Sequence, residues 1–243
     1  SVSEIPETKD SLALNCAFPR VNSGQELATA LDYTEAVIEQ LNNKLCKQII
    51  NISSQSVYSQ SEKEIKTENS IVGPSNLYGL TKYAVEQLVR IKCHQFNMNY
   101  INIRLGSLAS PTFDQRLINR FYYKLINKEP ITIDGGSPKV SYLHVDDASS
   151  ALITLISKLK YSESNLSNTY NLGNNDYLEV QELAYFVNSI AEKYNLKPTK
   201  INMSNDISSY NNVIDSSKFY HQIGWCPEYT RKDLTSMIFK EKS

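Results

Sequence analysis

Short apolar runs alternate with longer amphipathic segments through the first 105 residues, and this alternation constrains the fold more than any other feature. The runs at 12–17, 48–53 and 99–105 are rich in β-branched residues and are predicted strands. The segments at 25–43 and 76–96 repeat apolar residues at helical spacing and are predicted helices. A strand-helix-strand-helix-strand order favours a parallel sheet with right-handed crossovers.

After residue 106 the patterns become shorter and more mixed. The predicted helices are 117–127, 146–160, 179–194 and two more near the end, and the predicted strands are 131–133, 140–145, 170–173 and 200–203. Ser75 is the expected N-cap of helix 76–96, and Asp146 that of helix 146–160. The 243 residues suffice for one large α/β domain or two smaller lobes, and we interpret the second half as a smaller α/β lobe packed over the first.

Composition excludes several classes of protein. A net charge of −1 gives no electrostatic case for binding nucleic acid or an anionic membrane surface. No apolar run approaches the roughly 20 residues that span a bilayer, and the polar, acidic first ten residues do not resemble a secretory signal. The cysteines and histidines are scattered along the chain, at Cys16, Cys46, Cys93, Cys226, His94, His144 and His221. This spacing predicts neither disulfides nor a metal site, and it favours a reducing, cytoplasmic location.

The stretch from 48 to 82 carries the candidate chemistry. Ser54 ends a predicted buried strand, and Tyr78 and Lys82 stand one turn apart on the following helix. A tyrosine pKa near 10 is too high for a base at neutral pH, but an adjacent ammonium lowers it. The ordinary alternative is a tyrosine at the core edge beside a solvated lysine, although Tyr78 is the only tyrosine here with lysine four residues later.

In a parallel sheet the ligand site lies beyond the carboxyl ends of the strands. Three predicted strands end in polar or small residues: Asn15-Cys16, Ser53-Ser54 and Gly106-Ser107. We therefore expect these three strand ends to meet at one crevice, beside the helix of Tyr78 and Lys82.

These residues resemble a known family. The similarity begins in Ser53-Ser54-x-x-Val57-Tyr58 and Tyr78-Gly79-Leu80-Thr81-Lys82, which resemble the extended short-chain dehydrogenase/reductases, the NAD-dependent epimerase/dehydratase family. It continues through Leu14-Asn15-Cys16-Ala17, Ile103-Arg104-Leu105, Tyr142-Leu143-His144-Val145-Asp146-Asp147, Tyr170-Asn171-Leu172-Gly173 and Gly224-Trp225-Cys226-Pro227. The resemblance implies a Rossmann-like, doubly wound parallel sheet with a smaller C-terminal α/β substrate lobe.

The resemblance also implies domains and site residues. Residues 1–106 would be the remainder of the dinucleotide-binding domain, and 107–243 mainly the substrate lobe, with 140–173 returning to the sheet. Ser54, Tyr78 and Lys82 would be the catalytic triad. The cofactor-binding set would be Asn15, Cys16, Ala17, Tyr78, Lys82, Gly106 and Leu108, and the substrate-binding set Gln55, Ser56, Ser107 and Lys139.

The implied activity is that of an NAD- or NADP-dependent epimerase or reductase acting on a sugar, in particular a nucleotide-linked sugar. Family members often dimerise through the helices that correspond to 25–43 and 76–97, so a homodimer is expected. Two alternatives stay open: a non-catalytic relative that senses dinucleotide or serves as a scaffold, and an inactive fragment of such an enzyme.

The front of the chain departs from the family, which opens with a G-x-x-G-x-x-G turn between a strand and a helix. Gly24 is the only glycine before Gly73, so this motif and about three strands are missing. The sequence could be a piece of a longer protein, could have residues omitted, or could be a truncated relative unable to bind dinucleotide. The start at Ser1 rather than methionine favours the first two explanations.

Other departures bear on the reaction and the substrate. Gln55 and Ser56 occupy the positions of the acidic pair of the 4,6-dehydratases, so dehydration is disfavoured. Val140 replaces a frequent diphosphate-binding arginine, although Lys139 is adjacent, and Ser107 replaces a frequent asparagine. The asparagine that often completes a tetrad has no counterpart near Ala30.

The remaining conspicuous residues are expected to be structural. His144 is interpreted as a hydrogen-bonded strand histidine, and Asp146 and Asp147 as a helix cap and first-turn charge. Tyr58 and Trp225 are predicted packing residues.

Overall fold

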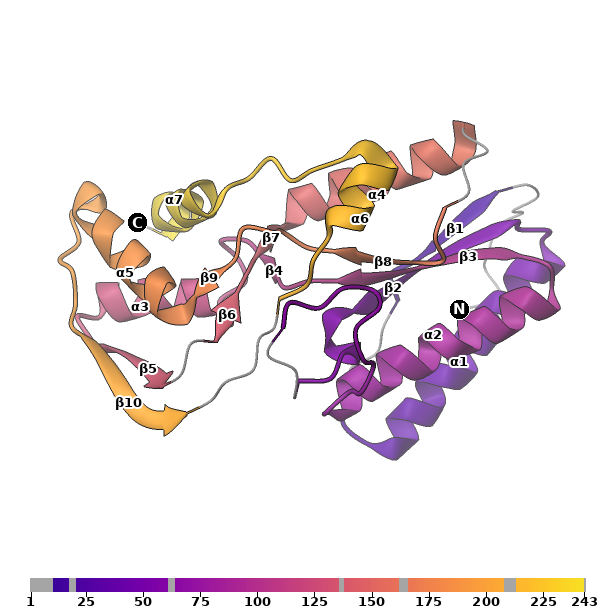
Figure 1. The fold of residues 1–243 in the computed structure, drawn as a ribbon, viewed down its shortest axis with the longest axis horizontal. Coiled ribbons are helices and arrows are strands. Elements are labelled where there is room, and N and C mark those ends of the chain that lie inside the picture. The colour runs from indigo at the N-terminus through magenta and orange to yellow at the C-terminus, as the bar shows by residue number, and fades with distance from the viewer. Residues whose placement is uncertain are drawn as a thin grey trace.

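A parallel sheet with helices on both faces forms the first part of the molecule (Figure 1). The computed structural model describes residues 11–17, 21–60, 64–135, 138–161, 166–207 and 213–242; side chains at 134–135 and 205–207 are not described. The sheet has the strand order β1-β2-β3-β8, with bounds β1 (Leu12–Asn15), β2 (Gln48–Ser54), β3 (Asn99–Leu105) and β8 (Thr169–Leu172). All neighbouring pairs are parallel, which confirms the predicted fold class.

One face of this sheet is covered by two long helices that lie side by side, α1 (Gly24–Asn43) and α2 (Leu77–Gln95) (Figure 1). Their inward residues enclose Ile49 of β2 in an apolar cluster that includes Ile38, Leu41, Val85, Val89 and Cys93. The other face packs against α4 (Val145–Tyr161). There the strand residues Ile50, Ile101, Ile103 and Leu172 contact Ala148, Ala151 and Leu155.

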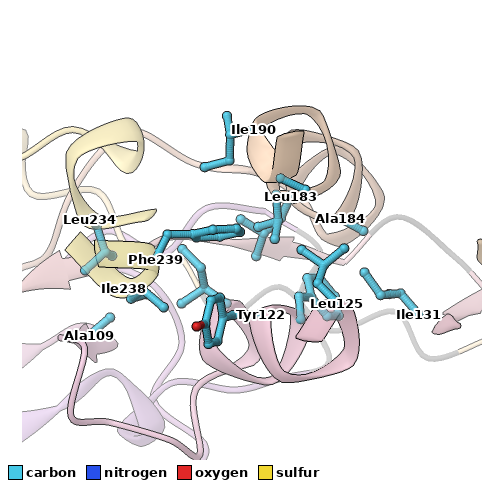
Figure 2. Close-up of a cluster of buried hydrophobic side chains, with 14 of the residues drawn as sticks. Ala109, Tyr122, Leu125, Ile131, Leu183, Ala184, Ile190, Leu234, Ile238 and Phe239 are labelled. Carbon is cyan, nitrogen blue, oxygen red and sulfur yellow. The ribbon is translucent and has the colours of Figure 1, made fainter. Parts of the chain in front are cut away.

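The second part of the molecule holds a separate apolar core (Figure 2). It lies among three helices and a two-stranded parallel sheet: α3 (Leu117–Ile126), α5 (Val180–Ile190), α7 (Arg231–Lys242), β5 (Ile131–Gly135) and β10 (Ile201–Ile207). Tyr122 and Phe239 meet edge to face at its centre, with ring centroids 4.9 Å apart.

The remaining described elements are short. They are η2 (Gln55–Val57), β4 (Leu108–Ala109), β6 (Lys139–Val140), β7 (Leu143–His144), β9 (Leu178–Glu179), η3 (Ala191–Tyr194), α6 (Ser217–Phe219) and the π-helical turn η4 (Tyr220–Gly224). The single strand predicted at 140–145 is wrong, because β6 pairs with β9 and β7 pairs with β4. The two halves of this segment pair with different strands, and the local sequence pattern does not show where one pairing ends and the next begins.

Two predicted helix caps are also wrong. Asn76, and not Ser75, is the N-cap of α2, and its side chain accepts a hydrogen bond from the Gly79 N–H at 2.8 Å. Asp146 lies within the first turn of α4, and its N–H donates to Nδ1 of His144 at 3.2 Å. His144 therefore takes the capping role that was expected of Asp146.

Among the described residues, no helix is both long enough and apolar enough to cross a bilayer.

Candidate active site

A cavity of about 450 Å³ lies where β2 and β3 end beside the first turns of α2. The residues predicted to be catalytic, Ser54, Tyr78 and Lys82, all line this cavity. Its remaining lining comprises Ile52, Ser53, Gln55, Ser56, Leu105, Gly106, Ser107, Leu108 and Arg116. A site at the carboxyl ends of parallel strands is the usual place for a ligand in a sheet of this type.

Ser54 is fixed by the turn that follows β2. It is 7% exposed, and its Oγ accepts a hydrogen bond from the backbone N–H of Ser56 at 3.1 Å. The next residue, Gln55, donates from Nε2 to Oγ of Ser107 at 3.1 Å. Three of the predicted substrate-binding residues, Gln55, Ser56 and Ser107, are thus neighbours on one wall, held together by contacts between the ends of β2 and β3.

The first turn of α2 approaches this wall closely because Gly79 has no side chain. A Cβ atom at Gly79 would lie 2.1 Å from the backbone oxygen of Ser56, a distance that no real contact allows. The glycine between Tyr78 and Lys82 therefore lets the helix pack directly on the turn after Ser54. This close approach sets the distance between the tyrosine and the serine.

Tyr78 and Lys82 differ sharply in their exposure. Tyr78 is 40% exposed, so its phenol can meet a ligand in the cavity, whereas Lys82 is 5% exposed. The Lys82 ammonium donates to the backbone oxygen of Ile52 at 2.8 Å. Burial lowers the pKa of Lys82 to about 8, while the nearby Cys16 thiol and Glu86 carboxylate raise it. Lys82 is therefore a buried cation whose charge is sensitive to pH.

The residues predicted to bind a cofactor are divided between this cavity and the end of β1. Gly106 and Leu108 line the cavity, and Cys16 interacts electrostatically with Lys82. Asn15 and Ala17 are not among its lining residues; the Ala17 N–H donates to Oδ1 of Asn15 at 3.2 Å.

The Asn15 side chain begins a hydrogen-bonded row across the sheet. Its Nδ2 donates to Oδ1 of Asn51 at 3.1 Å, and Asn51 in turn donates to Asn102 at 2.9 Å. The three residues are in register on β1, β2 and β3. The row therefore ties the loop after β1 to the strands that carry the cavity.

Lys139 is not brought to the cavity. It lies on β6, and its ammonium is 5.2 Å from the ring centroid of Tyr177. The positive charge in the lining that the sequence did not reveal is Arg116, the residue at the N-cap position of α3. A basic residue directly before an apolar helical pattern was the available signal.

The hydroxyl of Tyr142 lies near the same helix start. Burial raises the pKa of Tyr142 to about 12, while Arg116 and hydrogen bonds with the backbone N–H groups of Leu117 and Ile118 oppose that rise. Tyr142 therefore remains a neutral phenol that accepts hydrogen bonds from N–H groups in the first turn of α3, which begins beside Arg116.

Residues 17–173 match the model of the NAD dependent epimerase/dehydratase family. The chain belongs to this family. Among curated proteins, it is 28% identical over 153 residues to the dTDP-D-glucose 4,6-dehydratase of Dictyostelium discoideum, covering 58% of this chain and 34% of that protein. It is 26% identical over 192 residues to the dTDP-glucose 4,6-dehydratase of Xanthomonas campestris, covering 74% of this chain and 53% of the relative. This family member thus spans about a third to a half of the curated relatives' length.

Solved structures of the same fold cover most of the chain. The UDP-N-acetylglucosamine 4-epimerase of Bacillus cereus matches with a TM-score of 0.73 at 20% identity, over 95% of this chain and 78% of that one. The dTDP-glucose 4,6-dehydratase of Bacillus anthracis, crystallised with NAD, matches with a TM-score of 0.75 at 18% identity, over 96% of this chain and 73% of that one. At these identities the matches establish the fold, and they confirm the Rossmann-like class.

Proposed function

We propose that the whole protein is an NAD(P)-dependent nucleotide-sugar epimerase or reductase that uses Ser54, Tyr78 and Lys82. The observation that carries this proposal is the convergence of a serine, an accessible phenol and a buried ammonium on one cavity. The names of the family relatives, which are nucleotide-sugar epimerases and dehydratases, support it.

Each side chain has a distinct part in proton transfer. Tyr78 exchanges a proton with a hydroxyl of the sugar as that carbon is oxidised or reduced. Lys82 favours the phenolate by its charge, because an ammonium one helical turn away stabilises the anion. Ser54 holds the reacting oxygen beside the phenol by a hydrogen bond. A bound nicotinamide supplies the hydride acceptor or donor.

We propose that the cavity holds the reacting parts of the sugar and the nicotinamide. At about 450 Å³ it lies within the usual range for small-molecule sites. The residues at hand to hold the nicotinamide end are Cys16, Lys82, Gly106 and Leu108. Asn15 and Ala17 would support that end through the loop after β1.

The outer edge of β1 is where we propose that the rest of the dinucleotide-binding domain attaches. Within the described residues β1 pairs only with β2, so its other edge is open. A second hollow, of about 610 Å³, is lined partly by β1 and α4, with the apolar residues Leu12, Leu14, Ile156 and Leu159 among its lining. In this proposal residues 1–106 belong to the dinucleotide-binding domain and 107–243 mainly to the substrate lobe, with 140–173 returning to the sheet through β8.

Arg116 supports a substrate that carries negative charge. Val140 stands where the family often has a phosphate-binding arginine, and Arg116, at the start of α3, can supply a guanidinium in its place. A guanidinium binds phosphate with more directional hydrogen bonds than a lysine does. Lys139, directed to Tyr177, would need to move to contribute. A nucleotide diphosphate beside the sugar is therefore the substrate class that we propose.

Gln55 and Ser56 favour epimerisation or reduction over dehydration. Elimination of water needs a general acid and base beyond the tyrosine, and neither an amide nor an unactivated hydroxyl serves in that role at neutral pH. The test is product analysis by NMR after incubation of the whole protein with NAD or NADP and a panel of UDP- and dTDP-hexoses. We expect an epimer or an oxidised or reduced sugar; a product that has lost water would contradict this assignment.

The alternative is a non-catalytic relative that senses dinucleotide or acts as a scaffold. The observations that favour it are Val140 and Ser107, which replace a frequent arginine and a frequent asparagine of the family. Calorimetric titration of the whole protein with NAD, NADP and sugar nucleotides separates the cases. Binding of dinucleotide without turnover supports a sensor, and binding of none of these ligands supports a scaffold.

We further propose a cytoplasmic homodimer that pairs through the outward faces of α1 and α2. These faces carry exposed apolar side chains, including Tyr33, Leu80 and Ile91. Light scattering should give twice the mass of one chain for the wild type and a lower mass for Ile91→Glu. A monomeric wild type would refute the pairing.

A further inference from the structure

Next to the cavity, α2 carries a carboxylate that is buried and paired with a buried arginine. Glu86 lies one turn after Lys82 and is 2% exposed. Its Oε1 accepts a hydrogen bond from Oγ of Ser53 at 2.5 Å. Arg104 of β3 donates to both carboxylate oxygens, at 3.0 Å from Nε and at 2.8 Å from Nη2. Glu86 thus joins the helix of the candidate site to two strands that end at the cavity.

Arg104 is itself held from a second direction. Its guanidinium lies 4.8 Å from the ring centroid of Tyr58, and Arg104 is 6% exposed. The Tyr58 hydroxyl donates to Oδ1 of the buried Asn171 at 2.7 Å, and Asn171 donates to the backbone oxygens of Lys66 and Asp215. Burial raises the pKa of Tyr58 to about 12, so Tyr58 stays a neutral donor.

Fold stability alone does not require such a pair. Removing two charged groups from water can cost more free energy than their attraction returns, and an apolar pair of similar volume is often equally stable. Glu86 also lies one turn of α2 from Lys82 and interacts with it electrostatically, and Arg104 is the ion-pair partner of Glu86. A role connected with Lys82 explains both the cost and the location.

The groups that face Lys82 come from several elements. Cys16 follows β1, Glu86 lies on α2, and the backbone oxygen of Ile52 on β2 accepts the ammonium hydrogen bond. Tyr78 and Arg116 line the same cavity. Two groups raise the pKa of Lys82 against the effect of burial, Cys16 and Glu86, and of these Glu86 is the carboxylate.

We propose that Glu86 is a positioning residue of the site. Its carboxylate, fixed by Ser53 and Arg104, holds the Lys82 turn of α2 against β2 and supplies the counter-charge that keeps Lys82 an ammonium. This inference rests on the proposed function, in which the Lys82 charge favours the Tyr78 phenolate.

Two variants of the whole protein test the proposal. Glu86→Gln removes the charge and preserves the shape, but it leaves Arg104 without its carboxylate. The double variant Glu86→Gln with Arg104→Met removes both charges, so its folding does not depend on an unpaired buried guanidinium. Asp147→Asn is the matched control, because Asp147 is also a buried carboxylate, bonded to the N–H groups of Glu228 and Tyr229 away from the cavity.

The first measurement is the pH dependence of kcat. In Glu86→Gln the upper pH limit should fall by about one unit, which lowers kcat at pH 8 roughly fivefold; in the double variant it should fall by less, because the Arg104 cation is lost together with the carboxylate. Asp147→Asn should reduce thermal stability and leave the limit in place. A purely structural Glu86 would behave like Asp147, with lower stability and an unchanged pH profile.

The second measurement is independent of turnover. An NMR titration of the lysine ammonium groups follows Lys82 directly, with its signal identified by its loss in Lys82→Arg. A lower midpoint in both Glu86 variants supports the proposal even if no sugar nucleotide is turned over, a result that would reject the proposed function alone. A Lys82 midpoint equal to that of the wild type in both variants overturns the role of Glu86.

Discussion

On the face of the sheet that α1 and α2 cover, the side chains change from apolar to polar from the middle of the strands toward their carboxyl ends, whereas the face beneath α4 is apolar along β2 and β3 until Ser54 at the cavity. The first face runs from Ile49 to Asn51 and Ser53 along β2. The second carries Ile50 and Ile103, both fully buried. Successive strand residues point to opposite faces, so one short strand serves both purposes.

This difference separates two tasks within one sheet. Apolar burial beneath α4 stabilises the fold without directional constraint. The hydrogen bonds and charges beneath α2 fix particular atoms, namely the loop after β1, the turn that holds Ser54 and the helical turn of Lys82. We therefore expect substitutions on the α4 face to change mainly the free energy of unfolding and substitutions on the α2 face to change mainly the site.

The largest stability effect should follow from Ile103→Ala on the α4 face. Removing this fully buried side chain leaves a cavity and should lower the free energy of unfolding by about 2–5 kcal/mol. Denaturant unfolding measures the loss. The pH profile of the remaining folded protein should not change, and a shifted profile would show that the two faces are not separate.

Gly79→Ala should have the largest effect on the site itself. The added methyl group would strike the backbone oxygen of Ser56 and push α2 away from the turn after Ser54. A displacement of about 1 Å commonly costs on the order of 100-fold in rate. Gly73→Ala is the control, since its Cβ would meet Ser59 at an ordinary 3.4 Å. Equal turnover of the two variants would contradict the close packing.

Asn51→Leu sharpens the comparison within β2. The substitution leaves the carboxamides of Asn15 and Asn102 without their partner, which should cost about 1–3 kcal/mol of unfolding free energy although the new side chain is apolar. Its neighbour Ile50 faces α4, and Ile50→Leu should cost less than about 1.5 kcal/mol. Equal losses of unfolding free energy in the two variants would show that the hydrogen bonds of the asparagine row do not make Asn51 harder to replace than an apolar residue.

These positions also mark how far the sequence alone could predict the structure. Hydrophobic periodicity located the sheet strands and the long helices, because the residues that each element buries recur at the period of that element. The Ser54, Tyr78 and Lys82 cavity followed from the rule that parallel strands end at a common edge. The pairing of Glu86 with Arg104 could not be predicted, since each is an ordinary charge in an amphipathic pattern until α2 lies over β3.

Smaller elements escaped prediction for a related reason. Arg116 reaches the cavity because α3 begins there, and His144 replaces Asp146 as a cap because its ring nitrogen faces the helix start. Both depend on where distant segments pack. The strand predicted at 140–145 divides because β4 and β9 each pair with part of it.

The Lys82 pKa predicts a pH dependence in which activity and stability move in opposite directions. The pKa of Lys82 is lowered from 10.5 to about 8, so its charge is lost as the pH rises through 8 and kcat should fall about tenfold per further unit. The folded state binds this proton more weakly than the unfolded state does. The stability cost is therefore fully present below pH 8 and is relieved between 8 and 10.5.

Denaturant unfolding of wild type and Lys82→Met across this range isolates the effect of the lysine. The stability advantage of Lys82→Met should shrink as the pH rises from 8 to 10.5. A difference that stays constant would mean that Lys82 is not a buried cation in solution.

The central claim is that Tyr78 transfers the proton that accompanies hydride transfer. The most direct measurement is a single-turnover experiment in which the whole protein, loaded with oxidised dinucleotide, is mixed with sugar nucleotide while the absorbance of the reduced nicotinamide is followed. Tyr83→Phe, five residues along the same helix and outside the lining of the cavity, is the matched control. We predict that Tyr78→Phe binds dinucleotide normally but forms reduced nicotinamide at least 100-fold more slowly than wild type and Tyr83→Phe. Formation at the wild-type rate in Tyr78→Phe would contradict the assignment.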